Sequence, residues 1–181
     1  MTSVLILALY CERIAADTAR WSLTSTDSVV LRRADERRVE RDERTLDIAL
    51  DDPRMSSNHA RLIRIGERWI VEDRGSKNGT IVNGRPLMRA ALSDGDLIEV
   101  GRMLLMYREL DQTDVVDLDR RALSKKPRAL RTLSVALERT YQALADLVST
   151  PGPVALFAEA RTRSEPIARA VHELGGKRGK L

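Results

Sequence analysis

The chain has 181 residues, of which 31 are Lys or Arg and 27 are Asp or Glu, and its formal net charge is +4. This length suits one domain of about 100 to 150 residues with an extension. The single cysteine, Cys11, excludes an internal disulfide, and without a His/Cys cluster at zinc-ligand spacing a structural zinc site is excluded too. We therefore expect a cytoplasmic protein without a metal or a cofactor.

The first apolar run, residues 4–10, is interpreted as a buried strand. A signal peptide is excluded because no basic residue precedes this run, and Glu12 and Arg13 follow it in place of a small-residue cleavage site. No later segment approaches the roughly 18 apolar residues of a membrane span. We therefore expect no membrane partner.

Short apolar segments separated by turn residues continue to about residue 112. The predicted strands are residues 4–10, 28–32, 46–49, 60–65, 69–72, 80–82, 97–100 and 103–108. The turns between them are rich in Gly, Asn and Asp, which accept the backbone conformations that tight turns need. The pattern is typical of an all-β domain and predicts a β-sandwich.

The charge is distributed unevenly along the chain. Residues 120–181 carry 13 Lys or Arg and 5 Asp or Glu, a net of +8, which leaves residues 1–119 at −4. Within the basic part, residues 120–131 include six basic residues and no acidic one. A solvated linker is the favoured interpretation of this segment, and contact with nucleic acid or another acidic partner is the less favoured alternative.

The part of the chain after this basic segment has a different character. Apolar residues recur at the spacing of one helical face over residues 130–148, and the Pro-Gly-Pro sequence at 151–153 ends that helix. Residues 154–157 predict a short buried strand, and residues 165–174 predict a second helix. We therefore expect a small helical or α/β extension.

The stretch Ser-Ser-Asn-His at residues 56–59 fits either a hydrolase or a phosphate-binding surface. A nucleophilic serine needs a base in reach and is usually presented on an elbow such as G-x-S-x-G, which this sequence lacks around Ser56. A phosphate-binding surface needs an arginine, hydroxyl groups, backbone N–H groups and a side-chain amide on loops of a rigid scaffold. The sequence offers all of these, so we expect binding without catalysis.

These motifs resemble a known family. The sequence "SSNHA" followed by "GSKNGTIVNG" is similar to the forkhead-associated (FHA) domain, with its Gly-Arg pair, Ser-x-x-His and two Asn-Gly turns. The resemblance covers roughly residues 1–112. It implies a β-sandwich of about eleven strands that binds phosphothreonine peptides and is not an enzyme.

The resemblance implies a phosphopeptide site that consists of Arg33, Ser56, Ser57, Lys77 and Asn78. The hydroxyl of Ser56 would bond the phosphate, and Ser57 takes the position where an arginine or asparagine often contributes. Lys77 would lie beside the phosphothreonine, and Asn78 would hold the peptide backbone. Arg33 would supply the guanidinium.

A second set of positions has a structural role in the resemblance: His59, Gly79, Thr80, Asn83 and Gly84. Among them, His59 would brace the binding loop from beneath. Two other residues are interpreted from the sequence itself: Trp69 as a core residue, and Arg54 as either a surface charge or a helper at the rim of the site.

The Gly-Arg pair of the family falls at Arg32 and Arg33, so that Arg32 stands where the pattern has glycine. If that glycine takes a positive φ, an arginine there costs on the order of 1 kcal/mol. In that case the affinity for a peptide is reduced.

Residues 132–181 resemble the start of the AAA+ domain of sigma-54-dependent transcription activators, in which a helix, a strand and a phosphate loop precede the sequence "ARAVHEL". Here Ala158, Arg161 and Arg163 stand in place of the loop glycines, and Ser164 stands in place of its lysine. Bulky side chains obstruct the wrapping of backbone N–H groups around phosphates. The segment is therefore interpreted as an incomplete remnant that does not hydrolyse ATP.

The sequence thus predicts an FHA domain over residues 1–112, a basic linker over 113–131 and the AAA+-like remnant over 132–181. The favoured function is a bacterial phosphothreonine-binding module whose partner is a Ser/Thr kinase or a substrate of that kinase. The alternative is a regulator of transcription that acts through an AAA+ partner or DNA.

Overall fold

The computed structural model describes residues 1–11, 18–119, 123–150, 152–157, 159 and 164–176. The chain divides into two compact units, Met1–Asp117 and Leu118–Leu181. Each unit is described by itself. In the part of the chain that is described, no helix is long and apolar enough to cross a membrane.

One sheet has seven strands in the order β13-β2-β1-β12-β11-β8-β9. These strands are β1 (Thr2–Tyr10), β2 (Ala19–Ser22), β8 (Thr80–Val82), β9 (Arg85–Pro86), β11 (Leu97–Val100), β12 (Met103–Leu110) and β13 (Leu118–Asp119). The first and last long strands of the domain, β1 and β12, are antiparallel neighbours at its centre, with Thr2 opposite Leu110.

The second sheet has six strands in the order β10-β7-β6-β3-β5-β4. These strands are β3 (Ser28–Arg33), β4 (Arg38–Asp42), β5 (Thr45–Leu50), β6 (Ala60–Ile65), β7 (Arg68–Asp73) and β10 (Arg89–Ala91). All neighbours are antiparallel except β3 and β5, which run parallel.

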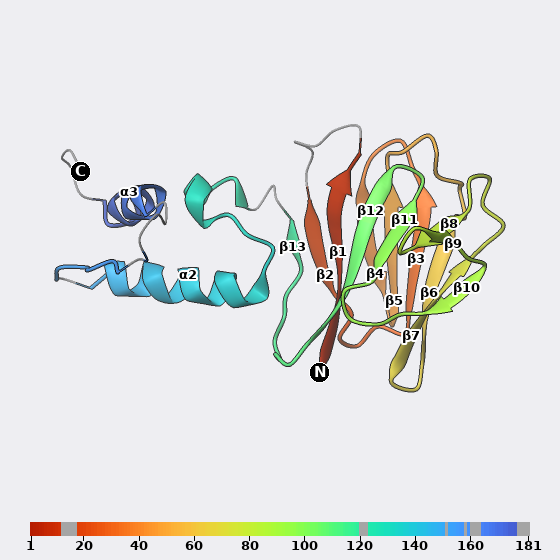
Figure 1. The fold of residues 1–181 in the computed structure, drawn as a ribbon, viewed down its shortest axis with the longest axis horizontal. Coiled ribbons are helices and arrows are strands. Elements are labelled where there is room, and N and C mark those ends of the chain that lie inside the picture. The colour runs from red at the N-terminus through yellow and green to blue at the C-terminus, as the bar shows by residue number, and fades with distance from the viewer. Residues whose placement is uncertain (12–17, 120–122, 151, 158, 160–163, 177–181) are drawn as a thin grey trace. The chain divides into compact units, whose positions relative to one another are not determined.

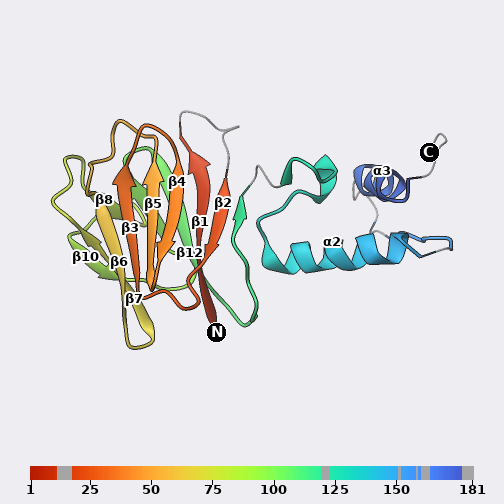
Figure 2. The same cartoon turned by 180° about the vertical axis from the view of Figure 1, so that it is seen from behind.

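The two sheets pack face to face as a β-sandwich (Figures 1 and 2). In the longer inner strands alternate residues point inward, and these side chains are fully or nearly fully buried. The second sheet contributes Val29, Leu31, Leu46, Ile48, Leu50, Leu62, Trp69 and Val71 to this core, and the first contributes Leu5, Leu7, Ile98, Val100, Met103, Leu105 and Tyr107. The prediction that Trp69 is a core residue is confirmed, since it is only 2% exposed.

The predicted all-β sandwich is confirmed, and every predicted strand of residues 1–112 is present. The structure has more strands than the expected eleven, thirteen among the described residues. One strand that the sequence did not reveal is β4, in which all five residues are exposed. An edge strand of charged residues carries no apolar alternation, so periodicity does not indicate it.

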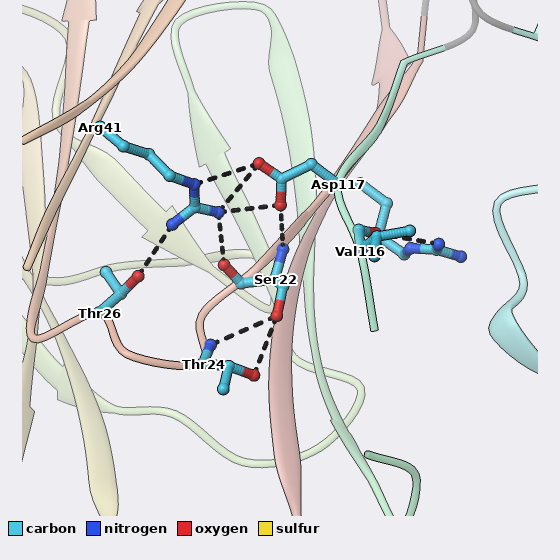
Figure 3. A network of polar contacts seen from close by, with 7 residues as sticks. Ser22, Thr24, Thr26, Arg41, Val116 and Asp117 are labelled. Atoms are coloured by element: carbon cyan, nitrogen blue, oxygen red, sulfur yellow. Dashed lines mark hydrogen bonds and ion pairs between the residues drawn. The ribbon is translucent and has the colours of Figure 1, made fainter. Parts of the chain in front are cut away.

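Arg41, in the edge strand β4, ties the edges of the two sheets together. Its guanidinium donates to the carbonyl oxygen of Ser22 in β2 at 2.7 Å, to the hydroxyl of Thr26 at 3.0 Å and to the carboxylate of Asp117 at 2.8 Å (Figure 3). The same carboxylate accepts the backbone N–H of Ser22 at 2.8 Å. Asp117 is thereby held against the edge of the sandwich.

Among its described residues, the C-terminal unit contains the 3₁₀ turn η1 (Arg128–Leu130) and the helices α2 (Val135–Val148) and α3 (Glu165–Leu174). Both predicted helices are present, although the first begins only at Val135, where the Ser134 hydroxyl accepts the backbone N–H of Leu137. In the segment expected to be a solvated linker, Leu123 and Leu130 are buried, so part of it is folded.

The predicted strand at residues 154–157 is wrong, because the structure has no regular secondary structure there and Phe157 is 96% exposed. A run of four apolar residues forms a strand only where a partner strand accepts its hydrogen bonds. The altered phosphate-loop positions Ala158, Arg161 and Arg163 lie outside the described residues.

Candidate functional site

Three loops meet at one end of the sandwich: residues 51–59 between β5 and β6, residues 74–79 between β7 and β8, and residues 101–102 between β11 and β12. The antiparallel pairing of β6 with β7 places Ala60 opposite Asp73, so the first two loops meet where these strands begin and end. Most of the sequence-predicted site residues lie in these loops.

His59 joins the first two loops from inside the protein. The backbone N–H of Ser56 donates to its Nδ1 at 3.0 Å, so Nε2 carries the ring proton and donates to the carbonyl oxygen of Gly79 at 3.1 Å. The side chain is completely buried. Burial lowers the pKa of His59 below its ordinary value of 6.5, against weaker opposing effects of the Gly79 hydrogen bond and of Asp73 and Asp52. The imidazole is thus a neutral brace beneath the loops.

Ser56 lies at the junction of three segments. Its side-chain oxygen accepts the backbone N–H of Lys77 at 3.0 Å, and its carbonyl oxygen accepts the backbone N–H of Arg33, at the end of β3, at 3.0 Å. Because the oxygen of the hydroxyl is the acceptor in the bond from Lys77, the hydroxyl hydrogen remains available to a ligand. Ser57, the next residue, is exposed.

Asp73 organises the second loop. Its carboxylate accepts the backbone N–H groups of Gly75 and Ser76 at 2.9 and 2.8 Å, and the hydroxyls of Ser76 and Thr80 at 2.6 and 2.7 Å. Burial raises the pKa of the Asp73 carboxyl, but these four hydrogen bonds outweigh it and hold the pKa below 3.8. The loop that carries Lys77 and Asn78 is therefore built around one carboxylate.

The third loop is attached to the first by Asp52, which is buried. The Asp52 carboxylate accepts the backbone N–H of Arg54 at 2.9 Å and also the backbone N–H of Arg102. Gly101, which directly precedes Arg102, has a φ of +63°. A Cβ atom added to Gly101 would lie 2.5 Å from Asp52 Oδ2 and 2.9 Å from the side chain of Met55. Close packing at Gly101 brings Arg102 next to Arg54.

A cavity of about 360 Å³ opens between the loops, and Pro53, Arg54, Lys77, Asn78 and Arg102 line it. Three of these residues are basic, and none of the described lining residues is acidic. The amide nitrogen of Asn78 donates to the carbonyl oxygen of Arg54 at 2.6 Å, and this bond uses only one of the two N–H groups and leaves the amide oxygen out. The cavity is suited to an anion.

Arg32 and Arg33 have different environments. Arg32 forms an ion pair with Asp47 at 2.7 Å and lies in β3 without a positive φ, so the position expected to need glycine is an ordinary strand position here. Arg33 is exposed and reaches the site through its backbone bond to Ser56. Neither Arg33, Ser56 nor Ser57 lines the cavity itself.

The turn between β8 and β9 lies outside the cavity. Asn83 and Gly84 both have positive φ, +50° and +76°, which is the backbone of a two-residue hairpin turn. The Asn83 side chain donates to Asp96 at 2.8 Å and accepts the backbone N–H of Leu97 at 2.9 Å. This turn shapes the hairpin, and neither Asn83 nor Gly84 lines the cavity.

The sequence interpretation missed Asp52, Asp73 and Arg102. The Asp-Arg-Gly-Ser order at residues 73–76 is a local signal for a carboxylate that bonds the backbone two and three residues ahead, and it could have indicated Asp73. No local signal indicates Arg102, because its partner Asp52 is 50 positions away.

Comparison with protein families gives a match to the FHA domain over residues 37–101. The match agrees with the FHA resemblance expected for this stretch, which contains the first two loops, the cavity residues up to Asn78 and both Asn-Gly turns. Arg33 and Arg102 lie just outside it.

Relatives with curated names match about a third of this chain. The chain is 44% identical over 61 residues to an oxoglutarate dehydrogenase inhibitor of Corynebacterium jeikeium, which is 34% of this chain and 42% of the relative. It is 41% identical over 61 residues to the glycogen accumulation regulator GarA of Mycolicibacterium smegmatis, 34% of this chain and 39% of the relative. The chain thus spans about two-fifths of the length of these relatives.

Among solved structures, the FHA domain of the CT664 protein from Chlamydia trachomatis aligns with a TM-score of 0.47 and 27% identity, over 61% of this chain and 99% of that chain. The resemblance of residues 132–181 to sigma-54-dependent activators has no support in these comparisons, and the elements described there are helices α2 and α3.

Proposed function

We propose that the FHA domain found in residues 37–101, together with the flanking strands of its sandwich, binds phosphothreonine peptides and acts without catalysis. The observation that carries this proposal is the hydroxyl of Ser56, which is fixed by the N–H of Lys77 beside a cavity lined by three basic residues. The resemblance of the loop motifs to the family supports threonine as the phosphorylated residue.

The geometry accounts for phosphate binding in terms of charge and donors. A phosphorylated residue carries a charge of about −1.5 to −2 at neutral pH and three strong acceptor oxygens. Lys77, Arg54 and Arg102 supply positive charge at the cavity, and the Ser56 hydroxyl hydrogen supplies an uncharged donor next to it. Charge-assisted hydrogen bonds of this kind are roughly twice as strong as neutral ones.

The amide of Asn78 provides recognition of the peptide chain. Its oxygen and one N–H lie at the cavity, where they can accept from and donate to a peptide backbone. Because the Asn78 side chain is already bonded to the carbonyl oxygen of Arg54, its orientation is set before a ligand arrives. Arg33, exposed at the end of β3, is the proposed further guanidinium for the phosphate.

The partner in this proposal is a protein phosphorylated on threonine, either a Ser/Thr kinase or one of its substrates. The relatives are named as an inhibitor and as a regulator, and both names fit a chain that acts by binding another protein. The kinase-signalling role of this chain is part of the proposal.

The test is a titration of the full chain with a degenerate phosphothreonine peptide library, with the unphosphorylated library as control. Ser56→Ala and Arg33→Ala should each weaken binding by at least about 1.5 kcal/mol, or about tenfold. Arg85→Ala, an exposed arginine in β9 outside the cavity, is the matched control and should leave the affinity unchanged. Equal binding of both libraries would refute the proposal.

A further inference from the structure

A short acidic loop after β12 exposes a threonine. Residues 111–114 read Asp-Gln-Thr-Asp, and Asp111, Thr113 and Asp114 are all exposed. The hydroxyl of Thr113 contacts the Asp114 carboxylate at 3.3 Å, near the upper limit for a hydrogen bond. Because the Thr113 side chain is exposed, a kinase can reach it on the surface of the folded domain.

The structure holds this loop at both of its ends. On one side, Leu110 is paired with Thr2 in the central strands. On the other side, Val115 is only 7% exposed, the carbonyl oxygen of Val116 accepts from Arg20 at 3.1 Å, and Asp117 is held by Arg41 (Figure 3). The loop is therefore a fixed projection of the sandwich and not part of a free tail.

Thr113 combines acidic neighbours with a position in an exposed loop, a combination that the other exposed threonines of the described chain lack. Thr150 has no acidic residue within three positions, and Thr140 lies inside helix α2. Thr24 lies in a tight turn, where its side-chain oxygen accepts from Ser22 at 3.0 Å. Thr113 has Asp111 two positions before it and Asp114 directly after it.

The charges of this loop complement those of the cavity. The cavity presents Arg54, Lys77 and Arg102, and the loop presents carboxylates on both sides of a threonine. We propose that Thr113, once phosphorylated, is a ligand for the cavity of a second copy of this chain. This inference rests on the proposed function, since it names a partner for the same site.

The position of the loop requires that the binding occurs between copies. Arg102, at the cavity, directly precedes β12, and Thr113 follows its last residue, Leu110. An extended strand of eight residues spans about 25 Å. Figures 1 and 2 show the segment after β12 at the end of the sandwich where the N-terminus lies, away from the loops between β5 and β6. Thr113 cannot reach the cavity of its own chain.

The modification itself is an ordinary phosphoryl transfer from ATP by a Ser/Thr kinase. The Oγ1 atom of Thr113 forms a bond to the γ-phosphorus, the bond from that phosphorus to the bridging oxygen of ADP breaks, and the hydroxyl proton passes to the base of the kinase. The product adds about −1.5 to −2 charge to a loop that is already acidic.

Contacts of this kind join different surfaces of the two partners. The cavity and Thr113 lie at opposite ends of β12, so each copy can bind one neighbour through its cavity and another through its phosphate. Such head-to-tail contacts extend into longer assemblies unless the rotation between copies closes a ring. Phosphorylation of Thr113 therefore predicts association that increases with protein concentration.

The first test uses peptides and the full chain. A phosphorylated peptide that spans residues 108–118 should bind at least about tenfold more tightly than its unphosphorylated form. The matched control is a peptide of residues 145–155 phosphorylated on Thr150, which lacks close acidic neighbours and should bind more weakly. Ser56→Ala should abolish the difference between phosphorylated and unphosphorylated peptides.

The second test uses the full chain with phosphothreonine installed at position 113, and its molar mass is measured by light scattering over a range of concentrations. We expect a mass above that of the monomer that rises with concentration, and a monomer when Ser56→Ala is combined with the phosphate. A monomer at all concentrations, or a Thr113 peptide no better than the Thr150 control while the phosphothreonine library binds, overturns this inference alone. Failure of the library as well overturns the proposed function.

Discussion

His59 donates its ring N–H to the carbonyl oxygen of Gly79 at 3.1 Å, and this bond joins two loops that are 20 positions apart in the chain. The other ring nitrogen accepts the N–H of Ser56, the residue whose hydroxyl we assign to the phosphate. One buried side chain therefore sets the distance between the Ser56 loop and the loop of Lys77 and Asn78. The site depends on this brace although His59 does not face the ligand.

Replacement of His59 by alanine should reduce both stability and phosphopeptide affinity. Two hydrogen bonds are lost and a cavity is left in a completely buried place, so we expect a loss of about 2–4 kcal/mol in the free energy of unfolding. Urea denaturation measures this change. Ser57→Ala, at an exposed position in the same loop, is the control for stability, and an equal loss of unfolding free energy in the two variants would contradict the role of His59.

The stability of the domain should decrease as the pH falls below about 6.5. The pKa of His59 is lowered in the folded state, so the unfolded state binds more protons in this range. The contribution of the neutral imidazole is complete above 6.5 and is lost as the pH falls toward and through the lower folded pKa. Urea midpoints at several pH values check this, and His59→Gln should remove that part of the pH dependence.

Asp73→Asn should loosen the loop of Lys77 and Asn78. The substitution removes the charge that accepts four hydrogen bonds from Gly75, Ser76 and Thr80. Hydrogen bonds to charged groups are worth about 1.5–3 kcal/mol, so we expect a stability loss of that order. Faster amide exchange at Lys77 together with weaker phosphopeptide binding would support the role. Unchanged exchange at that amide would argue against it.

The Asp73 carboxylate also predicts how the stability of the domain changes at low pH. Since the pKa of Asp73 is below 3.8 in the folded state, its contribution to stability is present above 3.8 and is lost as the pH falls through the folded value. A comparison of the acid unfolding curves of the wild type and Asp73→Asn measures it. The two curves should approach each other at low pH, and a constant separation would contradict this expectation.

Gly101→Ala should destabilise the domain more than Gly66→Ala. Both glycines have a similar positive φ, +63° and +60°, so alanine pays the same backbone strain of roughly 1 kcal/mol at each. At Gly101 the new Cβ also meets Asp52 at 2.5 Å, whereas nothing lies within 4 Å at Gly66. We expect an additional loss of about 1–3 kcal/mol at Gly101. Equal unfolding free energies for the two variants would show that the close packing at Gly101 is unimportant.

The strands could be predicted from the sequence where one face of the strand is buried and the other is exposed. β6, β8 and β11 have the predicted bounds, because apolar and polar residues alternate or the strand is enclosed by Gly and Asn turns. Helix α3 also begins and ends where the periodicity indicates. The exposed strand β4 could not be predicted, and residues 154–157 were wrongly predicted as a strand. In both cases strand formation depends on a neighbouring strand that is not part of the local sequence.

By itself the sequence determined the sandwich and the Ser-x-x-His and Asn-Gly motifs, because local periodicity and turn chemistry encode both. Only the tertiary structure decided which charges line the cavity. Arg102 lies beside Arg54 because Asp52 binds both of their backbone N–H groups. The bond from Arg102 to Asp52 joins residues 50 positions apart, on loops of the two different sheets, so it exists only once the sheets have packed.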